Sequence, residues 1–346
     1  MGGVVTTTSA RGTLTDRFGR AHHDLRISLT DRCSLRCTYC MPADGVPWLA
    51  RSTMLSTDEI VRVARVGVEL GIREIRLTGG EPLLRVDVVD VVRRLTALTT
   101  PDGAPVEVSL TTNALRLPAL AAPLRDAGLS RVNISLDTLD RAKFLELTRR
   151  DKLVETLAGI AAADAAGLHP VKINAVAMRG VNDDEVVALT RFAVDRGYQM
   201  RFIEQMPLDG GHTWDRQVMV TQAEILERLT SQFTLTEVPG RGAAPAELWY
   251  VDGGPHTVGV IASVTAPFCG ACDRLRLTAD GQLRACLFSE AEVDTREALR
   301  SDEPADVVDE GVAAAYRRCL AGKKAGHGID DPKFLQPTRP MSAIGG

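Results

Sequence analysis

Arg26-Ile-Ser-Leu-Thr-Asp-Arg-Cys33-Ser-Leu-Arg-Cys37-Thr-Tyr39-Cys40-Met-Pro42 is the most informative stretch of this chain, because it holds three cysteines in close succession. Three thiolates at this spacing can bind three irons of a four-iron cluster and leave the fourth iron without a protein ligand. Such an open iron can bind the amine and carboxylate of a small molecule. The alternative is a zinc knuckle, which needs a fourth Cys or His, and none stands nearby in the sequence.

A second group of cysteines follows in the last third of the chain. Cys269, Cys272 and Cys286 have the spacing Cys-X2-Cys-X13-Cys, and the histidine closest in sequence is His256. Alone, this spacing suits a zinc ribbon that lacks one ligand as well as it suits an iron–sulfur cluster. Beside the first triad, a second cluster with an open iron is the better account. Cys319 lies apart in a helical-looking run, so we expect a buried structural thiol there.

Composition limits the class of protein. The 346 residues allow one large domain or about two average ones. A content of 45% hydrophobic and 25% charged residues is typical of a globular protein. We find no apolar run that could span a membrane and no signal-peptide core. Cysteines grouped in threes predict a reducing compartment, so we expect a cytoplasmic protein. The net charge of −4 argues against a nucleic-acid polymer as partner.

Short apolar strands alternate with amphipathic helices through the first two thirds of the chain. This alternation predicts a parallel sheet, either open and doubly wound or rolled into a partial (βα) barrel. Polar residues recur just after successive strands, which favours the barrel. We expect strands near 25–30, 74–78, 106–111, 131–136, 171–177 and 199–204, and helices near 58–70, 86–98, 117–127, 152–166 and 183–196.

The alternation ends at about Pro207. Beyond it we expect a helix near 222–230, short strands near 248–251 and 257–261, and a helix near 304–319. The Gly/Thr/Ser-rich start, residues 1–13, is predicted to be a disordered leader. The expected organisation is therefore a barrel over residues 14–206 and a C-terminal segment over residues 207–346.

Residues with chemical potential follow the predicted strands. Thr78-Gly79-Gly80-Glu81-Pro82 follows the second strand, Thr111-Thr112-Asn113 the third, and Asn133-Ile134-Ser135-Leu136-Asp137 overlaps the fourth. Glycines let the main chain approach a ligand closely. Each segment alone could be an ordinary turn, but their repetition at successive strand ends predicts one site at the rim of the barrel.

Long cations stand in the predicted strands, where they are unusual. If several of them point into one barrel, they repel one another unless an anion joins them. The planar guanidinium of arginine suits phosphate groups, so a triphosphate substrate is expected. The alternative is that half of them form surface ion pairs. The residues in predicted strands are Arg26, Arg76, Lys172 and Arg201, and two further arginines, Arg274 and Arg276, directly follow the second cysteine pair.

Taken together, these motifs resemble the GTP 3′,8-cyclase family of radical S-adenosylmethionine (SAM) enzymes. The resemblance rests on the first cysteine segment, on Arg76-Leu-Thr-Gly-Gly-Glu-Pro-Leu-Leu-Arg85, on Cys269-Gly-Ala-Cys272-Asp-Arg-Leu-Arg276, on Cys286 and on the terminal Gly345-Gly346. It runs from about Leu14 to Gly346. One departure is Ala114, where the family pattern has glycine, and it affects only the local turn geometry.

The resemblance implies an α/β fold, an incomplete (βα)6 TIM-type barrel with a C-terminal extension that carries a second iron–sulfur cluster. Two [4Fe–4S] clusters are implied, one held by Cys33, Cys37 and Cys40 and one by Cys269, Cys272 and Cys286. The residues implied to contact SAM are Tyr39, Gly80, Ser135 and Met206. Those implied to bind GTP are Arg26, Arg76, Thr111, Lys172, Arg201, Arg274, Leu275 and Arg276.

The activity implied is the radical cyclisation of GTP to 3′,8-cyclo-7,8-dihydroguanosine triphosphate in molybdenum cofactor biosynthesis. An electron donor and cyclic pyranopterin monophosphate synthase, the next enzyme of that pathway, are the implied partners, and a homodimer is allowed. The terminal Gly-Gly is implied to reach into the active site. Two alternatives stay open: a radical SAM enzyme that modifies a peptide, and a zinc-stabilised binding scaffold without catalysis.

Overall fold

Six β-strands alternate with helices along the first part of the chain in the computed structural model, which describes residues 12–209, 211–332 and 334–345. Most of the predicted leader, residues 1–11, therefore lies outside the described residues. The strands are β1 (Asp24–Ser28), β2 (Glu74–Thr78), β3 (Glu107–Thr112), β4 (Arg131–Ser135), β5 (Lys172–Ala177) and β6 (Gln199–Glu204). The α-helices are α1 (Thr57–Glu69), α2 (Val88–Thr96), α3 (Leu117–Asp126), α4 (Arg141–Thr148), α5 (Leu153–Ala165) and α6 (Val186–Val194).

The C-terminal segment adds shorter elements. They are α7 (Gln222–Thr230), β7 (Leu235–Glu237), β8 (Glu247–Val251), β9 (Thr257–Ile261), β10 (Arg274–Leu277), β11 (Gln282–Arg284), β12 (Val293–Asp294), α8 (Arg296–Leu299), α9 (Ala305–Ala321) and α10 (Met341–Ile344). The predicted helix near 222–230 and strand near 257–261 are confirmed at these bounds, and the helix predicted near 304–319 is α9.

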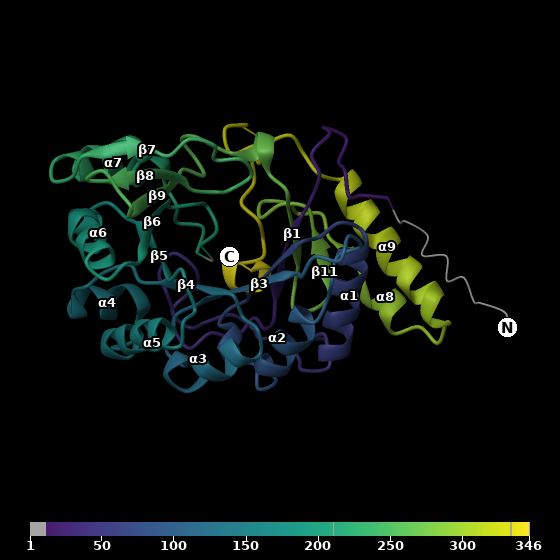
Figure 1. Cartoon of the computed structure of the whole chain (residues 1–346). Coiled ribbons are helices and arrows are strands. Elements are labelled where there is room, and N and C mark those ends of the chain that lie inside the picture. The colour runs from purple at the N-terminus through teal and green to yellow at the C-terminus, as the bar shows by residue number, and fades with distance from the viewer. Residues whose placement is uncertain (1–11, 210, 333, 346) are drawn as a thin grey trace.

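All described strands join one curved sheet, in the order β12-β11-β10-β1-β2-β3-β4-β5-β6-β9-β8-β7. Strands β1 to β6 pair in parallel, β10 adds in parallel to β1, and β9 adds in parallel to β6. The two ends of this order do not pair with each other, so the barrel stays open. Helices cover the outside of the curve (Figure 1). The predicted incomplete (βα)6 barrel is confirmed, and the C-terminal segment widens it at both edges.

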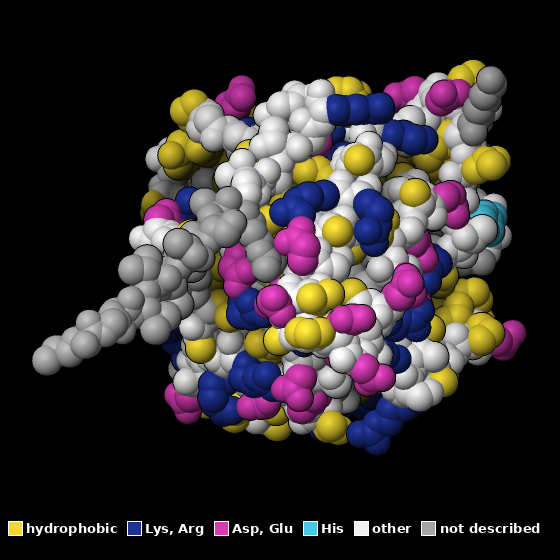
Figure 2. Space-filling view, turned by 90° about the vertical axis from the view of Figure 1, so that its right-hand side faces the viewer, with side chains coloured by type: hydrophobic (Ala, Val, Ile, Leu, Met, Phe, Trp, Pro, Cys, Tyr) yellow, Lys and Arg dark blue, Asp and Glu magenta, His cyan; other side chains and the backbone are white. Residues whose placement is uncertain are grey.

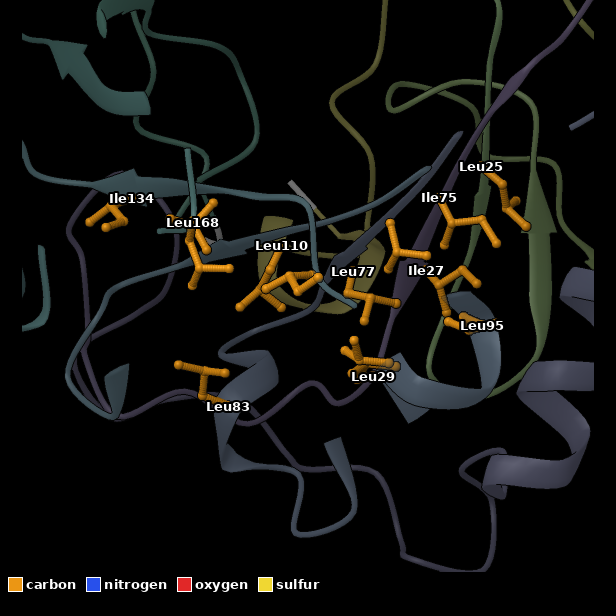
Figure 3. Close-up of a cluster of buried hydrophobic side chains, with 14 of the residues drawn as sticks. Leu25, Ile27, Leu29, Ile75, Leu77, Leu83, Leu95, Leu110, Ile134 and Leu168 are labelled. Carbon is orange, nitrogen blue, oxygen red and sulfur yellow. The ribbon is translucent and has the colours of Figure 1, made fainter. Parts of the chain in front are cut away.

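The pattern within each strand separates the core from the barrel interior. On β1, Leu25 and Ile27 are fully buried in the hydrophobic core, whereas Arg26 between them lines a cavity. Successive side chains of a strand point to opposite faces, so the leucine and isoleucine side chains face the helices and the arginine faces inward. Figure 3 shows the apolar layer, in which Leu77 and Leu110, partners in the register of β2 and β3, lie side by side.

Three described helices, α4 and the short α8 and α10, were not predicted, and α4 is the longest of them. Asp140 caps its first turn by accepting a hydrogen bond from the backbone N–H of Lys143 at 2.9 Å. Phe144 and Leu147 are buried, but Leu145 is exposed, so the apolar residues do not form the single stripe that marks an amphipathic helix. The role of this helix lies in its tertiary contacts, which are described below.

The face formed by α1, α8 and α9 has Lys and Arg side chains interspersed with Asp and Glu (Figure 2). Both Arg62 and Arg65 of α1 form ion pairs with Asp309 of α9, at 2.8 and 2.6 Å. In the same helix, α9, the side chain of Cys319 is buried, as predicted for a structural thiol. No helix of the described residues combines the length and apolarity needed to cross a bilayer.

Candidate active site

A cavity of about 260 Å³ lies inside the open barrel and brings together residues from most of the strands. Among its lining residues are thirteen of the predicted site residues: Arg26, Cys33, Cys37, Tyr39, Cys40, Arg76, Gly80, Thr111, Ser135, Arg201, Met206, Arg274 and Arg276. Residues from distant parts of the sequence thus meet at one concave site, as is typical of a ligand-binding pocket.

The loop with the first cysteine triad follows β1 and is held from outside by α4. Backbone N–H groups of Arg36 and Thr38 donate to the carbonyls of Thr148 and Leu147, each at 2.9 Å. The guanidinium of Arg149 donates to the carbonyl of Arg36 at 2.8 Å. The unpredicted helix therefore fixes the position of the cysteine loop at the carboxyl end of the barrel.

The environment of this triad fits an iron–sulfur cluster. Burial raises the pKa of Cys37 well above its usual value and that of Cys40 to about 12. Burial therefore disfavours the thiolate form of these cysteines unless a cation lies beside them. The backbone N–H of Leu35 and the amide of Asn113 point at the sulfur of Cys33, at 3.4 and 3.9 Å, as donors around cluster thiolates do.

The cysteines do not converge on a point. Within the described part of the chain, no three or more His, Cys, Asp or Glu side chains surround the position of a single metal ion. In a four-iron cluster each thiolate binds a different iron, so the ligands stand around a larger volume than one ion needs.

The glycine pair after β2 packs on the cysteine loop. The backbone N–H of Gly80 donates to the carbonyl of Thr30 at 2.8 Å. Gly79 has φ +145, and a Cβ at either glycine would collide with the backbone of residues 30–32. The predicted close approach of the main chain is therefore made, in part, to another segment of the chain. The buried carboxylate of Glu81 completes the turn by accepting from the backbone N–H of Asn113 at 2.7 Å.

Tyr39 and Asp137 form a buried polar pair on the wall of the cavity. The phenol of Tyr39 donates to a carboxylate oxygen of Asp137 at 2.8 Å, and the other oxygen accepts from the backbone N–H of Val176, also at 2.8 Å. Burial raises the pKa of Asp137 to about 6. The pair ties the first cysteine loop to β4 and β5.

The cations predicted to bind phosphate stand next to one another across the sheet. In the strand register Arg26 pairs with Arg76 on one side and with Arg276 on the other. The row continues through Ser109 to Arg131, which the sequence analysis did not single out. The alternation Arg131-Val-Asn133-Ile-Ser135 was the available signal, because it places all three polar residues on the inner face of β4.

Few anions balance these cations. Arg131 forms an ion pair with Glu107, but the carboxylate closest to Arg26 is that of Asp24, at 3.9 Å. Burial and then the neighbouring Arg76 lower the pKa of Arg26 well below its usual range. The guanidinium groups of Arg201 and Arg276 donate to the neutral oxygens of Gln199 and Gly345. Burial, followed by nearby arginines, lowers the pKa of both to about 10.

Two predicted GTP ligands stand apart from this cavity. Lys172 does not line the cavity. Burial, followed by the charges of Arg201, Arg131 and Arg76, lowers the pKa of Lys172 to about 7, so its ammonium is close enough to these cations to be repelled by them. The side chain of Leu275 is fully buried in the hydrophobic core, on the opposite face of β10 from Arg274 and Arg276. Only the main chain of Leu275 could face a ligand.

The second triad lines a smaller cavity of about 70 Å³ that adjoins the first and shares Met206, Arg274 and Arg276 with it. Cys269 and Cys272 precede β10, whereas Cys33 follows β1, and the two strands are parallel. The triads therefore lie toward opposite ends of the barrel. The arginines of β1, β2 and β10 stand between them.

The tail enters the same site. Arg276 donates a hydrogen bond to the carbonyl of Gly345, and Met341 lines the main cavity. Gly345 has φ +73, and a Cβ there would meet the hydroxyl of Ser28 and the methyl of Thr78. Helix α10, which precedes Gly345, lies within the barrel opening (Figure 1), while Gly346 is outside the described residues.

Comparison with known families agrees with this geometry. Residues 27–193 match the radical SAM superfamily, and residues 198–329 match the family described as Molybdenum Cofactor Synthesis C. The fold resembles the crystal structure of Streptococcus suis SuiB bound to S-adenosylmethionine, with a TM-score of 0.62 at 15% identity over 88% of this chain and 68% of that one.

Relatives of much higher identity carry one name. A GTP 3′,8-cyclase of Streptomyces coelicolor is 57% identical over 336 residues, which are 96% of each chain. A GTP 3′,8-cyclase of Corynebacterium glutamicum is 54% identical over 96% of this chain and 89% of the relative. A GTP 3′,8-cyclase 2 of Mycobacterium bovis is 52% identical over 99% of this chain and 94% of the relative. The chain therefore belongs to the GTP 3′,8-cyclase family of radical SAM enzymes.

Proposed function

We propose that this chain converts GTP into (8S)-3′,8-cyclo-7,8-dihydroguanosine 5′-triphosphate in molybdenum cofactor biosynthesis, the activity for which its relatives are named. The observation that carries the proposal is the row of arginines formed by Arg26, Arg76 and Arg276 in the cavity that also holds the first cysteine triad. Arg26 and Arg276 are buried, and the one carboxylate that pairs with either of them among the described residues is that of Asp24, 3.9 Å from Arg26. Guanidinium groups with so little compensation favour a polyanionic substrate.

The triphosphate would lie against these arginines. Arg201 and Lys172 would add positive charge from β6 and β5, and Arg274 from β10. The hydroxyl of Thr111 would donate or accept a hydrogen bond at the edge of the same surface. Leu275 would contribute only main-chain groups. Each charge-assisted hydrogen bond contributes about 1.5–3 kcal/mol, so the set binds the substrate strongly enough to hold its ribose in one orientation.

SAM would bind at the other end of the cavity, beside the cluster of Cys33, Cys37 and Cys40. When bound, the reduced cluster and SAM would supply one chemical step: one electron from the cluster breaks the S–C5′ bond of SAM and gives methionine and a 5′-deoxyadenosyl radical, which would take a hydrogen atom from C3′ of the ribose. Tyr39, Gly80, Ser135 and Met206 would contact SAM. Apolar residues of the wall, among them Leu35 and Phe144, exclude water from the space where the radical acts.

A second [4Fe–4S] cluster on Cys269, Cys272 and Cys286 would present its open iron to the purine of GTP. Its adjoining cavity, which shares Arg274 and Arg276 with the main one, supports this assignment. We further propose an electron donor for the first cluster and transfer of the product to cyclic pyranopterin monophosphate synthase. Clusters on cysteines require reducing conditions, which supports a cytoplasmic location. We also propose that the chain forms a homodimer and that its two domains divide at residue 206.

Isotope transfer tests the proposed reaction. Anaerobically reconstituted protein is incubated with SAM, dithionite and GTP deuterated at C3′. The deuterium content of the 5′-deoxyadenosine is then measured by mass spectrometry. Deuterium in that product is the expected result. Undeuterated 5′-deoxyadenosine that forms equally without GTP would instead favour a radical SAM enzyme acting on another substrate, such as the peptide considered above.

A further inference from the structure

A buried lysine stands behind the second cysteine triad. Lys323 follows α9 and is 3% exposed. Its backbone N–H donates to the carbonyl of Leu320 at 3.0 Å, which fixes the residue in the turn that ends the helix. Lysine is almost never buried without a partner. The assignment of GTP and SAM contacts leaves this ammonium without a role.

The three protons of the ammonium have three acceptors. They are the carbonyl of Arg274 at 2.6 Å, the carbonyl of Ala285 at 2.9 Å and the sulfur of Cys272 at 3.7 Å. Arg274 lies two residues after Cys272, and Ala285 directly precedes Cys286. Lys323 therefore joins the two chain segments that carry the second triad and touches one of its sulfurs.

Among the residues that the structure describes, no carboxylate pairs with the charge of Lys323. Each described contact of its Nζ is to a carbonyl or to sulfur. A buried charge is costly unless an anion or several dipoles compensate it. The two carbonyls supply dipoles, and the anion within reach is the thiolate of Cys272. A four-iron cluster held by three thiolates carries net negative charge, which makes it a suitable counter-ion.

We propose that Lys323 is the buried counter-ion of the second cluster and raises its reduction potential. Reduction adds negative charge to a cluster, so an adjacent cation and an N–H···S hydrogen bond stabilise the reduced form more than the oxidised form. Lys323 acts through Cys272 and is a positioning residue for the cluster. This inference rests on the proposed second cluster.

Arg20 provides a matched control. Its guanidinium donates to the carbonyl of Cys269 at 2.6 Å and to those of Lys324 and Ala325 at 2.8 and 3.1 Å. It therefore ties the same two parts of the chain together, the triad loop and the turn after α9, through backbone contacts alone. Its side chain pairs with Asp16 at 2.6 Å. A purely structural role for Lys323 predicts similar effects for both residues.

The test uses full-length protein in which Cys33, Cys37 and Cys40 are replaced by alanine, so that only the second cluster remains. Iron and sulfide content are measured first, and the reduction potential follows from a titration monitored by electron paramagnetic resonance. The variants added to this background are Lys323→Met, Lys323→Arg and Arg20→Gln. We expect Lys323→Met to shift the potential to more negative values, Lys323→Arg to restore most of the shift, and Arg20→Gln to leave it near the parent value.

An unchanged potential in a fully loaded Lys323→Met protein overturns the proposal. If Lys323→Met fails to load iron while Lys323→Arg and Arg20→Gln load it, the charge is required for assembly and the counter-ion role stands. Equal loss of iron in all three variants shows a structural role and overturns the proposal. If the parent protein itself binds no cluster, the assignment of the second triad fails, which is a separate outcome from any effect of Lys323.

Discussion

Arg26 on β1 lies directly beside Arg276 on β10 in the parallel register of the sheet, and both side chains are buried. Like charges on neighbouring strands destabilise a sheet. A fold that keeps this pair in its interior does so at a cost in stability, as functional sites often do. The proposed triphosphate is the anion that offsets this repulsion.

Replacing Arg274 and Arg276 together by alanine should weaken GTP use by several orders of magnitude. Two charge-assisted hydrogen bonds at about 1.5–3 kcal/mol each correspond to roughly 10²–10⁴-fold in kcat/KM. The rate of cyclised product formed from GTP measures the effect, with iron content as the control for cluster loading. Near-normal turnover in the double variant would rule out the triphosphate assignment.

Arg26→Met should make the substrate-free protein more stable. The substitution removes a buried charge that has two arginines beside it and one carboxylate, that of Asp24, at 3.9 Å. We expect the relief of repulsion between the arginines to outweigh the loss of the weak contact with Asp24. We expect the thermal midpoint of the cluster-loaded protein to rise by a few degrees. Inorganic triphosphate should raise the midpoint of the wild type and have a smaller effect on the variant. A lower midpoint for Arg26→Met without triphosphate contradicts this account.

GTP affinity should fall as the pH rises above about 7. Burial and nearby arginines lower the pKa of Lys172 to about 7 in the free site, and a bound triphosphate raises it again. Between those two pKa values GTP binding takes up a proton, so the affinity falls by up to about tenfold per pH unit. Calorimetry in buffers of different ionisation heat measures the uptake. Lys172→Met should bind more weakly and show less pH dependence, and an unchanged uptake in that variant would argue against Lys172.

Without GTP, the same residue should make the protein more stable as the pH rises from about 7 toward 10.5. The folded-state pKa of Lys172 lies below the ordinary value of 10.5, so the unfolded chain binds more protons in this window. The free energy of unfolding therefore increases with pH there. The slope should be smaller in Lys172→Met, which thermal unfolding at several pH values can measure.

Deleting Gly345 and Gly346 should abolish cyclisation and leave the iron content unchanged. The carbonyl of Gly345 accepts a hydrogen bond from Arg276, so the tail holds a guanidinium of the proposed GTP site. Gly345→Ala should also reduce activity, because φ is +73 and a Cβ would meet Ser28 and Thr78. Gly326→Ala is the control, since a Cβ there has open space. Full activity after the deletion would leave the tail without a catalytic role.

Ala114→Gly should destabilise the protein less than Ala163→Gly does. Ala114 has φ +68, a conformation that costs a non-glycine residue about 1–2 kcal/mol. Both alanines are fully buried, so both variants lose a packed methyl group worth about 0.8 kcal/mol. Ala163 lies in the last turn of α5, where glycine adds a further cost because it loses more backbone freedom than alanine. Thermal or denaturant unfolding compares the two; equal destabilisation would contradict the strain at Ala114.

The departure at Ala114 shows how far family pattern and structure agree. The family pattern predicts glycine there, and the predicted effect of alanine is confined to the local turn. The positive φ confirms that the position calls for glycine. The turn also packs against Gly159 of α5, where a Cβ would collide with Ala114. A neighbouring glycine therefore provides the space that this turn needs.

Other features had no local signal. Helix α4 lacks a single apolar stripe, so the sequence did not predict it. Only the structure shows the helix and its hydrogen bonds to the first cysteine loop. The alternation of polar and apolar residues in β4 predicts that Arg131 points inward, but it does not predict which residues lie beside Arg131. Lys323 looks like an ordinary lysine after a helix, and only the fold shows that it is buried against Cys272.

The sequence alone determined the six βα units, the two cysteine triads and the polar residues at the strand ends. These features depend on the spacing of residues close together in the chain, which periodicity reveals. Only the tertiary structure decided that β9 and β10 extend opposite edges of the sheet, that Arg276 stands beside Arg26, and that Gly345 reaches Arg276. Such neighbours come from distant segments, and their pairing depends on how the whole sheet closes and not on any local pattern.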